Sequence, residues 1–446
     1  MFGSSTVLKA EFLTREQLSA LHLYKYRAID KSFVSRYVLS HYWNWCVQFF
    51  PINMAPNLIT LTGLLFMVLN VILAILFVPD MGNEDVSEIR WIYFSFAIGL
   101  WLYSTFDNVD GKQARRTGTS SPLGELFDHG CDAINCSFAA ILQATAVGLG
   151  HSKASVLLYS IAMLGFYLST VEEYHTGTLY LGYINGPTEG VLLSCFIFIL
   201  SGVYGKSSKR IERIYIYMRV CVYVCVCACS FITTSLYTYI SGPGIWKVPM
   251  KEAVKVAWLP KMIQDIPVSH AVIWWIGCLF LFTHAPTCFY AMYKACKQRQ
   301  QPFLRTMLVQ NMPIATYIIC FYAWIMSPYS TILTHQHFIL FAITTGIVFG
   351  RMATKVILAH LTKSKFPKFT VLLIPLMIGA ILTNIPILFP VIIGPIFTPK
   401  SEYAFLLAYF GFAVIAYMRW AIVVINSFCE FLGIQCLIIP PIKKVE

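Results

Sequence analysis

Long apolar stretches alternate along the chain with short segments rich in charged and turn-forming residues. A helix needs about 20 apolar residues to cross the hydrocarbon core of a bilayer, and ten of the stretches are close to that length or longer. They lie near 58–78, 92–108, 132–149, 154–172, 189–205, 270–292, 311–328, 336–358, 370–392 and 403–428. The pattern predicts an all-α, polytopic transmembrane helix bundle of about ten spans.

The segment before the first span has a different pattern. Residues 13–50 are amphipathic and predict a helix, with Thr14 and Gln17 placed to form a capping box at its start. Aromatic and basic residues crowd its second half, which predicts a helix that lies in the membrane interface. Residues 1–32 are polar and charged, so we expect no cleavable signal peptide.

Composition agrees with a membrane protein. The 446 residues are 57% hydrophobic and only 12% charged, against about 25% charged for an average soluble domain. The net charge of +12 is modest for this length, and no basic and aromatic strand pattern accompanies it, so we expect no nucleic-acid partner. The 14 cysteines lie in apolar runs without paired spacing, which argues against disulfides and zinc sites.

Charge in the loops predicts the orientation in the membrane. The N-terminal segment and the loops 293–305 and 359–369 are basic and belong on the cytosolic side, whereas the loop 79–90 is acidic and fits the opposite side. An even number of spans also places the C-terminus in the cytosol. Its Lys443 and Lys444 resemble a dilysine retrieval signal of the endoplasmic reticulum.

One segment does not fit this arrangement. Residues 214–240 are apolar enough to span, but an eleventh span would move the later basic loops to the wrong side. Alternating Val-Cys and Ile-Tyr runs within 206–240 are what a short DNA repeat would encode. We therefore interpret 206–240 as an interfacial or re-entrant insertion, or as an artefact of the gene model such as a retained intron.

Four carboxylates lie between the second and third spans, around a short basic turn. They are Asp107, Asp110, Asp128 and Asp132. Ionisable groups beside the hydrocarbon are costly and indicate a functional site. The first two fall on one face if the second helix continues, and the last two fall on one face if Pro122 begins the next helix. Hard oxygen donors that converge in this way are typical ligands of divalent metals.

His129 and Glu125 are four residues apart on the face beside these carboxylates. A histidine oriented by a glutamate is a suitable general base near neutral pH, so we expect His129 to act as the base and Glu125 to orient it. A purely supporting role for His129 is the weaker alternative, and Asp132 is the rival candidate for the base.

Residues 107 to 132 follow the pattern D-x2-D-G-x2-A-R-x8-G-x3-D-x3-D with every defined position filled. The chain thereby resembles the CDP-alcohol phosphotransferases, and the segments 172–190 and 357–364 look like those of the eukaryotic choline/ethanolamine branch. The resemblance implies transfer of phosphocholine or phosphoethanolamine from CDP-choline or CDP-ethanolamine to diacylglycerol, which yields phosphatidylcholine or phosphatidylethanolamine and CMP. It also implies that members usually form homodimers.

The resemblance implies a two-metal site and a nucleotide pocket. Two Mg²⁺ or Mn²⁺ ions held by the four aspartates would neutralise charge on the pyrophosphate. The side chains expected to bind the CDP-alcohol are Asn57, Gly111, Ala114, Arg115 and Gly124. The glycines and the alanine leave room for the nucleotide beside the helix backbones, and Arg115 adds positive charge. The acidic and aromatic residues of 172–190 could meet the ammonium group.

Two other functions remain open at this point. A relative with another acceptor, such as inositol or glycerol phosphate, would need an extra basic cluster for that charged acceptor. A cation transporter would use the aspartates as an ion site, but we expect such sites near the bilayer midplane and with inverted repeats, which the chain does not display. The enzyme interpretation places the protein in the endoplasmic reticulum or Golgi membrane, with its active site facing the cytosol.

The same reasoning divides the chain into five segments. They are a cytosolic segment with an interfacial helix (1–52), the catalytic helices (53–205), an insertion (206–268), the C-terminal transmembrane helices (269–430) and a cytosolic tail (431–446).

Overall fold

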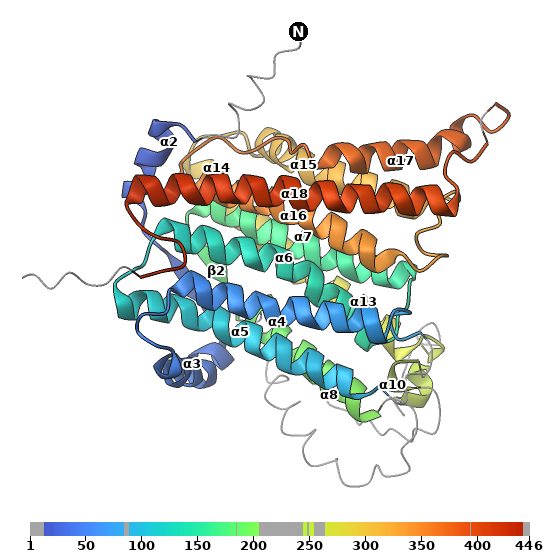
Figure 1. Cartoon of the computed structure of the whole chain (residues 1–446), viewed down its shortest axis with the longest axis horizontal. Coiled ribbons are helices and arrows are strands. Elements are labelled where there is room, and N and C mark those ends of the chain that lie inside the picture. The colour runs from blue at the N-terminus through green and yellow to red at the C-terminus, as the bar shows by residue number, and fades with distance from the viewer. Residues whose placement is uncertain are drawn as a thin grey trace, which may run out of the picture.

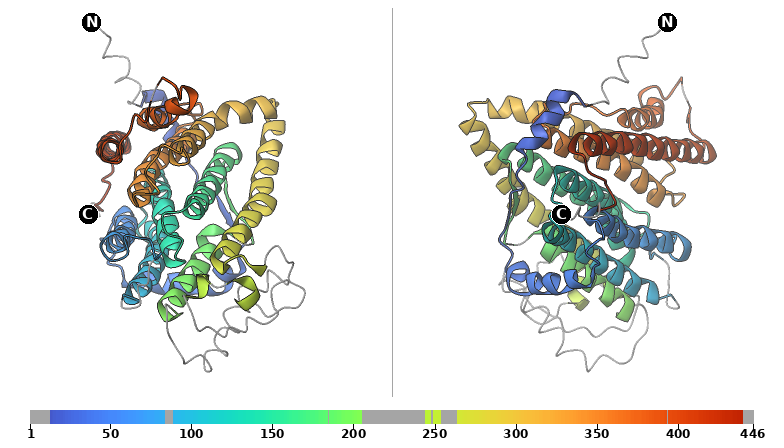
Figure 2. Two further views of the ribbon diagram at one scale, coloured as in Figure 1. Left: turned by 90° about the vertical axis from the view of Figure 1, so that its right-hand side faces the viewer. Right: turned by 60° about the vertical axis from the view of Figure 1, so that its left-hand side comes forward.

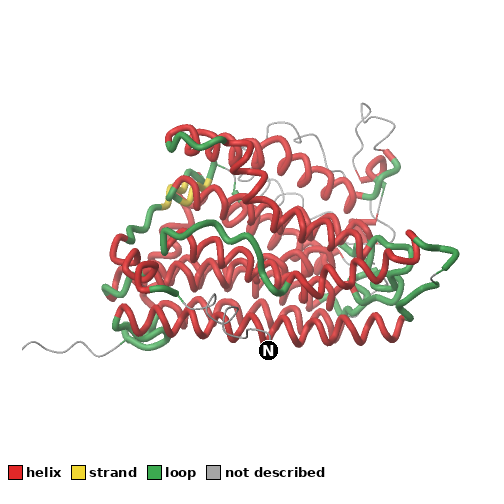
Figure 3. The backbone as a smooth tube through the Cα atoms, turned by 90° about the horizontal axis from the view of Figure 1, so that it is seen from above, coloured by secondary structure: helices red, strands yellow, loops and turns green. Residues whose placement is uncertain are grey.

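The computed structural model describes residues 13–83, 89–183, 185–204, 244–247, 249–253, 264–392 and 394–439. The insertion expected at 206–240 and the dilysine pair lie outside these residues. Within them, nearly all of the regular structure is helical, and long helices run side by side in a bundle (Figure 1). The all-α prediction is confirmed, apart from one pair of three-residue strands at one end of the bundle (Figure 3).

Each predicted span coincides with a helix. Among the residues that the structure describes, seven helical stretches are long and apolar enough to cross a membrane. They are α4 (Pro56–Phe77), α7 (Lys153–Thr176), η4 with most of α8 (Gly186–Gly190 and Val191–Tyr204), the continuous α13, η5 and α14 (Val268–Leu279, Phe280–His284 and Ala285–Gln298), α15 (Phe303–Ile325), α16 (Phe338–Leu361) and α18 (Pro399–Leu432). The other three predicted spans correspond to α17 (Leu373–Leu388), which is shorter, and to α5 (Trp91–Thr117) and α6 (Pro122–Ala146), which carry the charged motif. Two further short helices are α10 (Gly244–Lys247) and α11 (Met250–Ala253).

The core forms around α6 and α16. In α16, 83% of the most apolar window is buried, whereas the same share is 22% for α18, so α16 lies inside the bundle and α18 at its surface. Small residues allow the close approach of helices that packing inside a membrane requires. A Cβ on Gly346 of α16 would lie 2.4 Å from the Ser137 hydroxyl of α6, and one on Gly99 of α5 would clash with Asn70 of α4.

The two ends of the spanning region meet. Met54, just before α4, forms an isolated antiparallel bridge with Ile438, which follows α18. The chain therefore enters the first span and leaves the last one at the same end of the bundle. This arrangement requires an even number of crossings, as in the ten-span prediction.

The N-terminal segment differs in part from the prediction. Its capping box is confirmed, since Thr14 caps the short helix α2 (Arg15–Ser19) reciprocally with Gln17. The continuous helix over 13–50 is wrong, because the middle of the segment forms an extended strand. After the turn η1 (Ala20–Leu23), β1 (Ala28–Asp30) pairs in parallel with β2 (Leu179–Leu181), which follows α7. Helical structure resumes in η2 (Ser35–Leu39), α3 (Ser40–Cys46) and η3 (Val47–Phe49).

This strand pairing ties the N-terminal segment to the bundle. The segment runs along one end of the helices from α2 to α3 (Figure 2). The Gln17 amide donates to the Ser364 hydroxyl at 2.9 Å, and the Ser32 hydroxyl donates to Glu189. The ends of α7 and α16 and the start of α8 are thus held together by a segment that precedes all of them in the sequence.

Candidate active site

The candidate site is built where α5 turns into α6. As predicted, α5 continues through the motif to Thr117 and α6 begins at Pro122. Gly118 ends α5 in the left-handed conformation, with φ of +68°, which a glycine adopts without the strain of a Cβ. Ser121 then caps α6 by accepting a hydrogen bond from the Gly124 amide. This tight turn places the two halves of the motif on adjacent antiparallel helices.

Three of the four aspartates converge. Asp107, Asp128 and Asp132 each offer an oxygen atom, and these atoms lie within 4.8 Å of one another. One oxygen of Asp107 and one of Asp128 are buried without a hydrogen-bond partner. A buried carboxylate oxygen without a partner is costly, and a hard divalent cation such as Mg²⁺ supplies what it lacks. The chemistry of these donors therefore fits a divalent metal site.

Asp110 lies in a more enclosed position beside this cluster. It is 7% exposed, and it accepts a hydrogen bond from the Thr60 hydroxyl of α4. Asp132 similarly accepts one from the Tyr103 hydroxyl of α5. Neither hydroxyl donor was predicted from the sequence. Helical spacing gives a weak indication of both donors in the sequence. Tyr103 precedes Asp107 by about one helical turn, and Thr60 follows Asn57 by about one turn.

His129 pairs with a residue of another helix. Its Nδ1 atom lies 3.5 Å from the Glu173 carboxylate of α7, and both side chains are buried. Glu125, which we expected to orient His129, instead accepts a hydrogen bond of 2.6 Å from the Tyr24 hydroxyl. The ion-pair partner of His129 is therefore Glu173 rather than Glu125. Sequence analysis had singled out 172–190 as a polar stretch but could not place Glu173 against His129.

The residues expected to bind the nucleotide are partly brought together. Asn57 is buried, donates to the Cys436 carbonyl at 3.0 Å, and lies beside Gly124, where an added Cβ would be 3.8 Å from its Oδ1 atom. On α5, Gly111 and Ala114 are half-buried and Arg115 is exposed. The structure thus places Asn57 next to the start of α6, while Arg115 extends from the end of α5.

The other two basic residues of the motif turn hold the interfacial segment. The Lys112 ammonium donates to the Asn44 side chain at 2.8 Å. The Arg116 guanidinium donates to the backbone carbonyls of Val47 and Phe50 at 2.9 and 3.0 Å. Their charge is used to attach α3 and η3 to α5, which the resemblance alone did not indicate.

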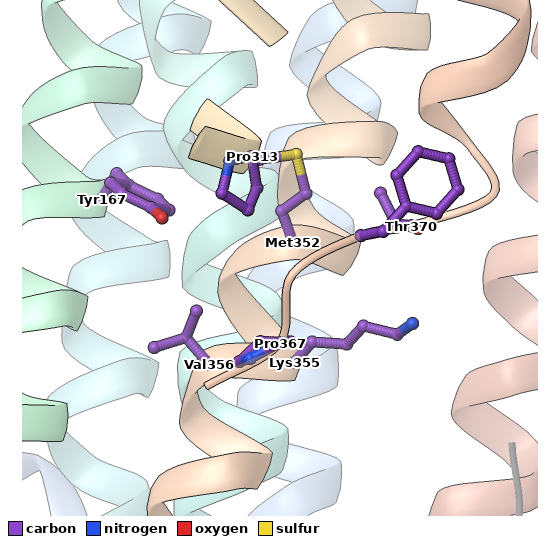
Figure 4. Close-up of a pocket in the computed structure, with 8 residues that line it drawn as sticks. Tyr167, Pro313, Met352, Lys355, Val356, Pro367 and Thr370 are labelled. Carbon is purple, nitrogen blue, oxygen red and sulfur yellow. The ribbon is translucent and has the colours of Figure 1, made fainter. Parts of the chain in front are cut away.

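A separate small cavity lies between α7, α15 and α16 (Figure 4). Tyr167, Pro313 and Met352 form much of its wall, and Lys355 and Thr370 add polar groups. Its lining contains none of the motif carboxylates. The cavity is therefore distinct from the candidate metal site.

Comparison with known proteins gives consistent matches. A family model described as CDP-alcohol phosphatidyltransferase matches residues 53–225. An uncharacterised CDP-alcohol phosphatidyltransferase class-I family protein of Schizosaccharomyces pombe is 34% identical over 429 residues, which cover 96% of this chain and 97% of the relative. Choline/ethanolaminephosphotransferase 1 of Arabidopsis thaliana is 32% identical over 436 residues, 94% of this chain and 96% of that protein. The protein of the same name from Saccharomyces cerevisiae is 46% identical over 196 residues, 44% of this chain and 49% of the relative.

The clustered carboxylates predict that one substitution has opposite effects on stability with and without metal. Charges within 4.8 Å of each other repel by roughly 3 kcal/mol or more at an effective dielectric constant near 20. In the presence of chelator, Asp128→Asn should therefore raise the unfolding temperature of the protein in detergent. The corresponding gain in the free energy of unfolding is on the order of 1–3 kcal/mol. With millimolar Mg²⁺ the wild type should become the more stable protein, because metal binding stabilises the folded state.

The control is Glu16→Gln, which removes an exposed carboxylate far from the cluster in the sequence. It should shift the unfolding temperature little, and equally, in both conditions. If Mg²⁺ stabilises wild type and Asp128→Asn alike, the cluster does not bind the metal.

Proposed function

The chain belongs to the CDP-alcohol phosphatidyltransferase class-I family, and from this we propose that it transfers phosphocholine or phosphoethanolamine from a CDP-linked alcohol to diacylglycerol. The products are phosphatidylcholine or phosphatidylethanolamine and CMP. The observation that carries the proposal is the carboxylate cluster of Asp107, Asp128 and Asp132 beside the buried pair of His129 and Glu173. Two of the relatives to which the chain is similar in sequence are named choline/ethanolaminephosphotransferases.

The reaction exchanges one phosphorus–oxygen bond for another. The hydroxyl oxygen of diacylglycerol attacks the phosphorus that carries the amino alcohol, and the bond from that phosphorus to CMP breaks. The hydroxyl proton needs an acceptor as the new bond forms. Since the Nδ1 side of His129 faces Glu173, its Nε2 atom remains to take this proton, and Glu173 stabilises the resulting positive charge.

Two divalent ions, Mg²⁺ or Mn²⁺, held by Asp107, Asp128 and Asp132 with Asp110 beside them, would neutralise the charge of the pyrophosphate and of the departing CMP. The protein's own contribution is to fix the positions of these oxygens. The Thr60 hydroxyl fixes one oxygen of Asp110 and the Tyr103 hydroxyl fixes one oxygen of Asp132, so neither carboxylate must reorient during the reaction.

The nucleotide is proposed to lie against the small residues of the motif. Gly111, Ala114 and Gly124 leave space beside α5 and α6, and the exposed Arg115 can approach a phosphate from the open side. Asn57 borders the same space from α4. Diacylglycerol is a lipid, and we expect it to reach the site from the surrounding bilayer.

The location in the cell follows from the same assignment. The substrates carry a soluble nucleotide, so the end of the bundle that bears the site would face the cytosol. We propose the endoplasmic reticulum membrane, or the Golgi, as its location. A homodimer is the assembly that the family resemblance favours.

The test of the function is a transfer assay in vesicles. The purified protein, reconstituted with diacylglycerol, should convert labelled CDP-choline or CDP-ethanolamine to the corresponding phospholipid and release CMP in equal amount. Product formation should stop with chelator and return with Mg²⁺ or Mn²⁺, and Asp110→Asn should abolish it. Transfer to inositol or glycerol phosphate, and not to diacylglycerol, would overturn the choice of acceptor.

The proposed roles also predict which step His129 serves. His129→Ala should lower turnover by roughly 100- to 10,000-fold, the usual cost of losing a general base, while CDP-choline binding stays nearly unchanged. Binding should persist because the nucleotide and pyrophosphate contacts are assigned to other residues. Glu173→Gln should lower turnover less than His129→Ala, because Glu173 orients the base and takes no proton itself. Turnover and calorimetric binding measured on the same preparations would test both statements.

Asp132→Asn provides the matched comparison, since Asp132 is the rival base. It should weaken binding of the CDP-alcohol in the presence of Mg²⁺, because it is a proposed metal ligand. Full turnover of His129→Ala, or a loss of binding as severe as that of Asp110→Asn, would contradict the assignment of His129.

A further inference from the structure

Glu125 is a buried acidic residue that the proposed mechanism does not use. It is 9% exposed and lies on α6 one turn before His129, on the same side of the helix as Asp128 and Asp132. Its hydrogen-bond partner is the hydroxyl of Tyr24, which brings no positive charge to the carboxylate. Burying a charge is costly, and a cationic ligand is one way to offset the cost.

Two tyrosines of the N-terminal segment face this carboxylate. Burial of the hydroxyl of Tyr24 and the negative charge of Glu125 raise the pKa of Tyr24, which therefore stays protonated as a hydrogen-bond donor. Burial of its hydroxyl and the charges of Asp128 and Glu125 likewise raise the pKa of Tyr26. Tyr26 remains 53% exposed, so much of its surface stays accessible to a ligand.

The attachment of the N-terminal segment fixes these tyrosines in place. Tyr24 and Tyr26 lie between two anchored points, the Gln17–Ser364 hydrogen bond and the pairing of β1 with β2. The Arg27 carbonyl, directly after Tyr26, accepts a hydrogen bond of 3.0 Å from the Leu179 amide. The strand that the helix prediction missed therefore holds two aromatic residues over the start of α6.

The substrate requires a subsite for its positively charged ammonium, close to the reacting phosphorus. The amino alcohol joins its ammonium to the reacting phosphorus through a two-carbon arm, so the ammonium lies within about one helical turn, 5.4 Å, of the reacting atoms. Glu125 precedes His129 by four residues, and side chains at this spacing have Cβ atoms about 5–6 Å apart. A carboxylate with aromatic rings beside it is a suitable binding site for a primary or quaternary ammonium.

We propose that Glu125, together with the rings of Tyr24 and Tyr26, binds the ammonium group of the CDP-linked amino alcohol. The inference rests on the proposed function and adds the residues that select its head group. Glu125 thereby has a binding role, separate from the orientation of His129, which belongs to Glu173. The N-terminal segment, in turn, completes the substrate site rather than only attaching to the membrane interface.

The test compares ligands with and without the ammonium. Calorimetry with Mg²⁺ would measure the affinity of wild type and Glu125→Gln for CDP-choline, CDP-ethanolamine, CDP-glycerol and CMP. Glu125→Gln should weaken binding of the first two by about 10- to 100-fold, because it removes the negative charge that attracts the ammonium. Binding of CDP-glycerol and CMP, which lack the ammonium, should change less than about twofold, and this would also show that the variant is folded.

The tyrosines give a second, independent comparison. Tyr26→Phe keeps the ring and should retain most of the affinity for CDP-choline, whereas Tyr26→Leu should lose several-fold because it removes the π-face. Glu16→Gln is the control for the N-terminal segment, since it removes an exposed carboxylate that lies before the two anchored points. It should leave the ratio of CDP-choline to CDP-glycerol affinity unchanged.

The outcomes separate this inference from the proposed function. If Glu125→Gln weakens all four ligands equally, or lowers turnover with no change in CDP-choline affinity, the ammonium assignment is wrong while the function stands. If wild type binds CDP-choline more tightly than CDP-glycerol through Glu125 but forms no phospholipid, the function is wrong and the ammonium site stands. Equal binding of CDP-choline and CDP-glycerol by wild type overturns the inference directly.

Discussion

The convergence of carboxylates inside a helix bundle is the constraint on which the rest of this structure depends. Asp107, Asp128 and Asp132 bring negative charges within 4.8 Å of one another at the end of membrane helices, and two of their oxygens have no hydrogen-bond partner. Clustered buried carboxylates are costly unless their charge is offset, and divalent cations can offset it. The tight turn between α5 and α6 and the hydroxyl donors around the cluster make sense as parts of a site for divalent ions.

The N-terminal segment has a larger role than its composition indicates. It reaches the ends of α7 and α16 and the start of α6 through a strand pair and side-chain hydrogen bonds. The basic residues Lys112 and Arg116 attach its second half to α5. The candidate site is therefore assembled from one helix pair, which carries the clustered carboxylates, and from surrounding segments that supply Glu173, the partner of His129, and the proposed ammonium receptor.

Local features of the site were predictable from the sequence, and contacts between distant segments were not. The continuation of α5, the start of α6 at Pro122 and the Thr14 cap follow from helix periodicity and capping, which act over a few residues. The pairing of His129 with Glu173 and of Glu125 with Tyr24 depends on which segments are neighbours in the fold. Periodicity predicts which face of a helix is buried, but not which segment that face contacts. The β1 strand was mistaken for helix because the strand that it pairs with, β2, lies about 150 residues away in the sequence.

The most direct test of the central claim is a titration of the wild-type protein with Mn²⁺, followed by electron paramagnetic resonance of the free ion. Our account predicts that the protein in detergent binds two Mn²⁺ ions per chain, that Mg²⁺ competes for them, and that Asp107→Asn loses at least one. A wild-type protein that binds no Mn²⁺ beyond the level of Asp107→Asn would contradict the claim that cations stabilise this carboxylate cluster.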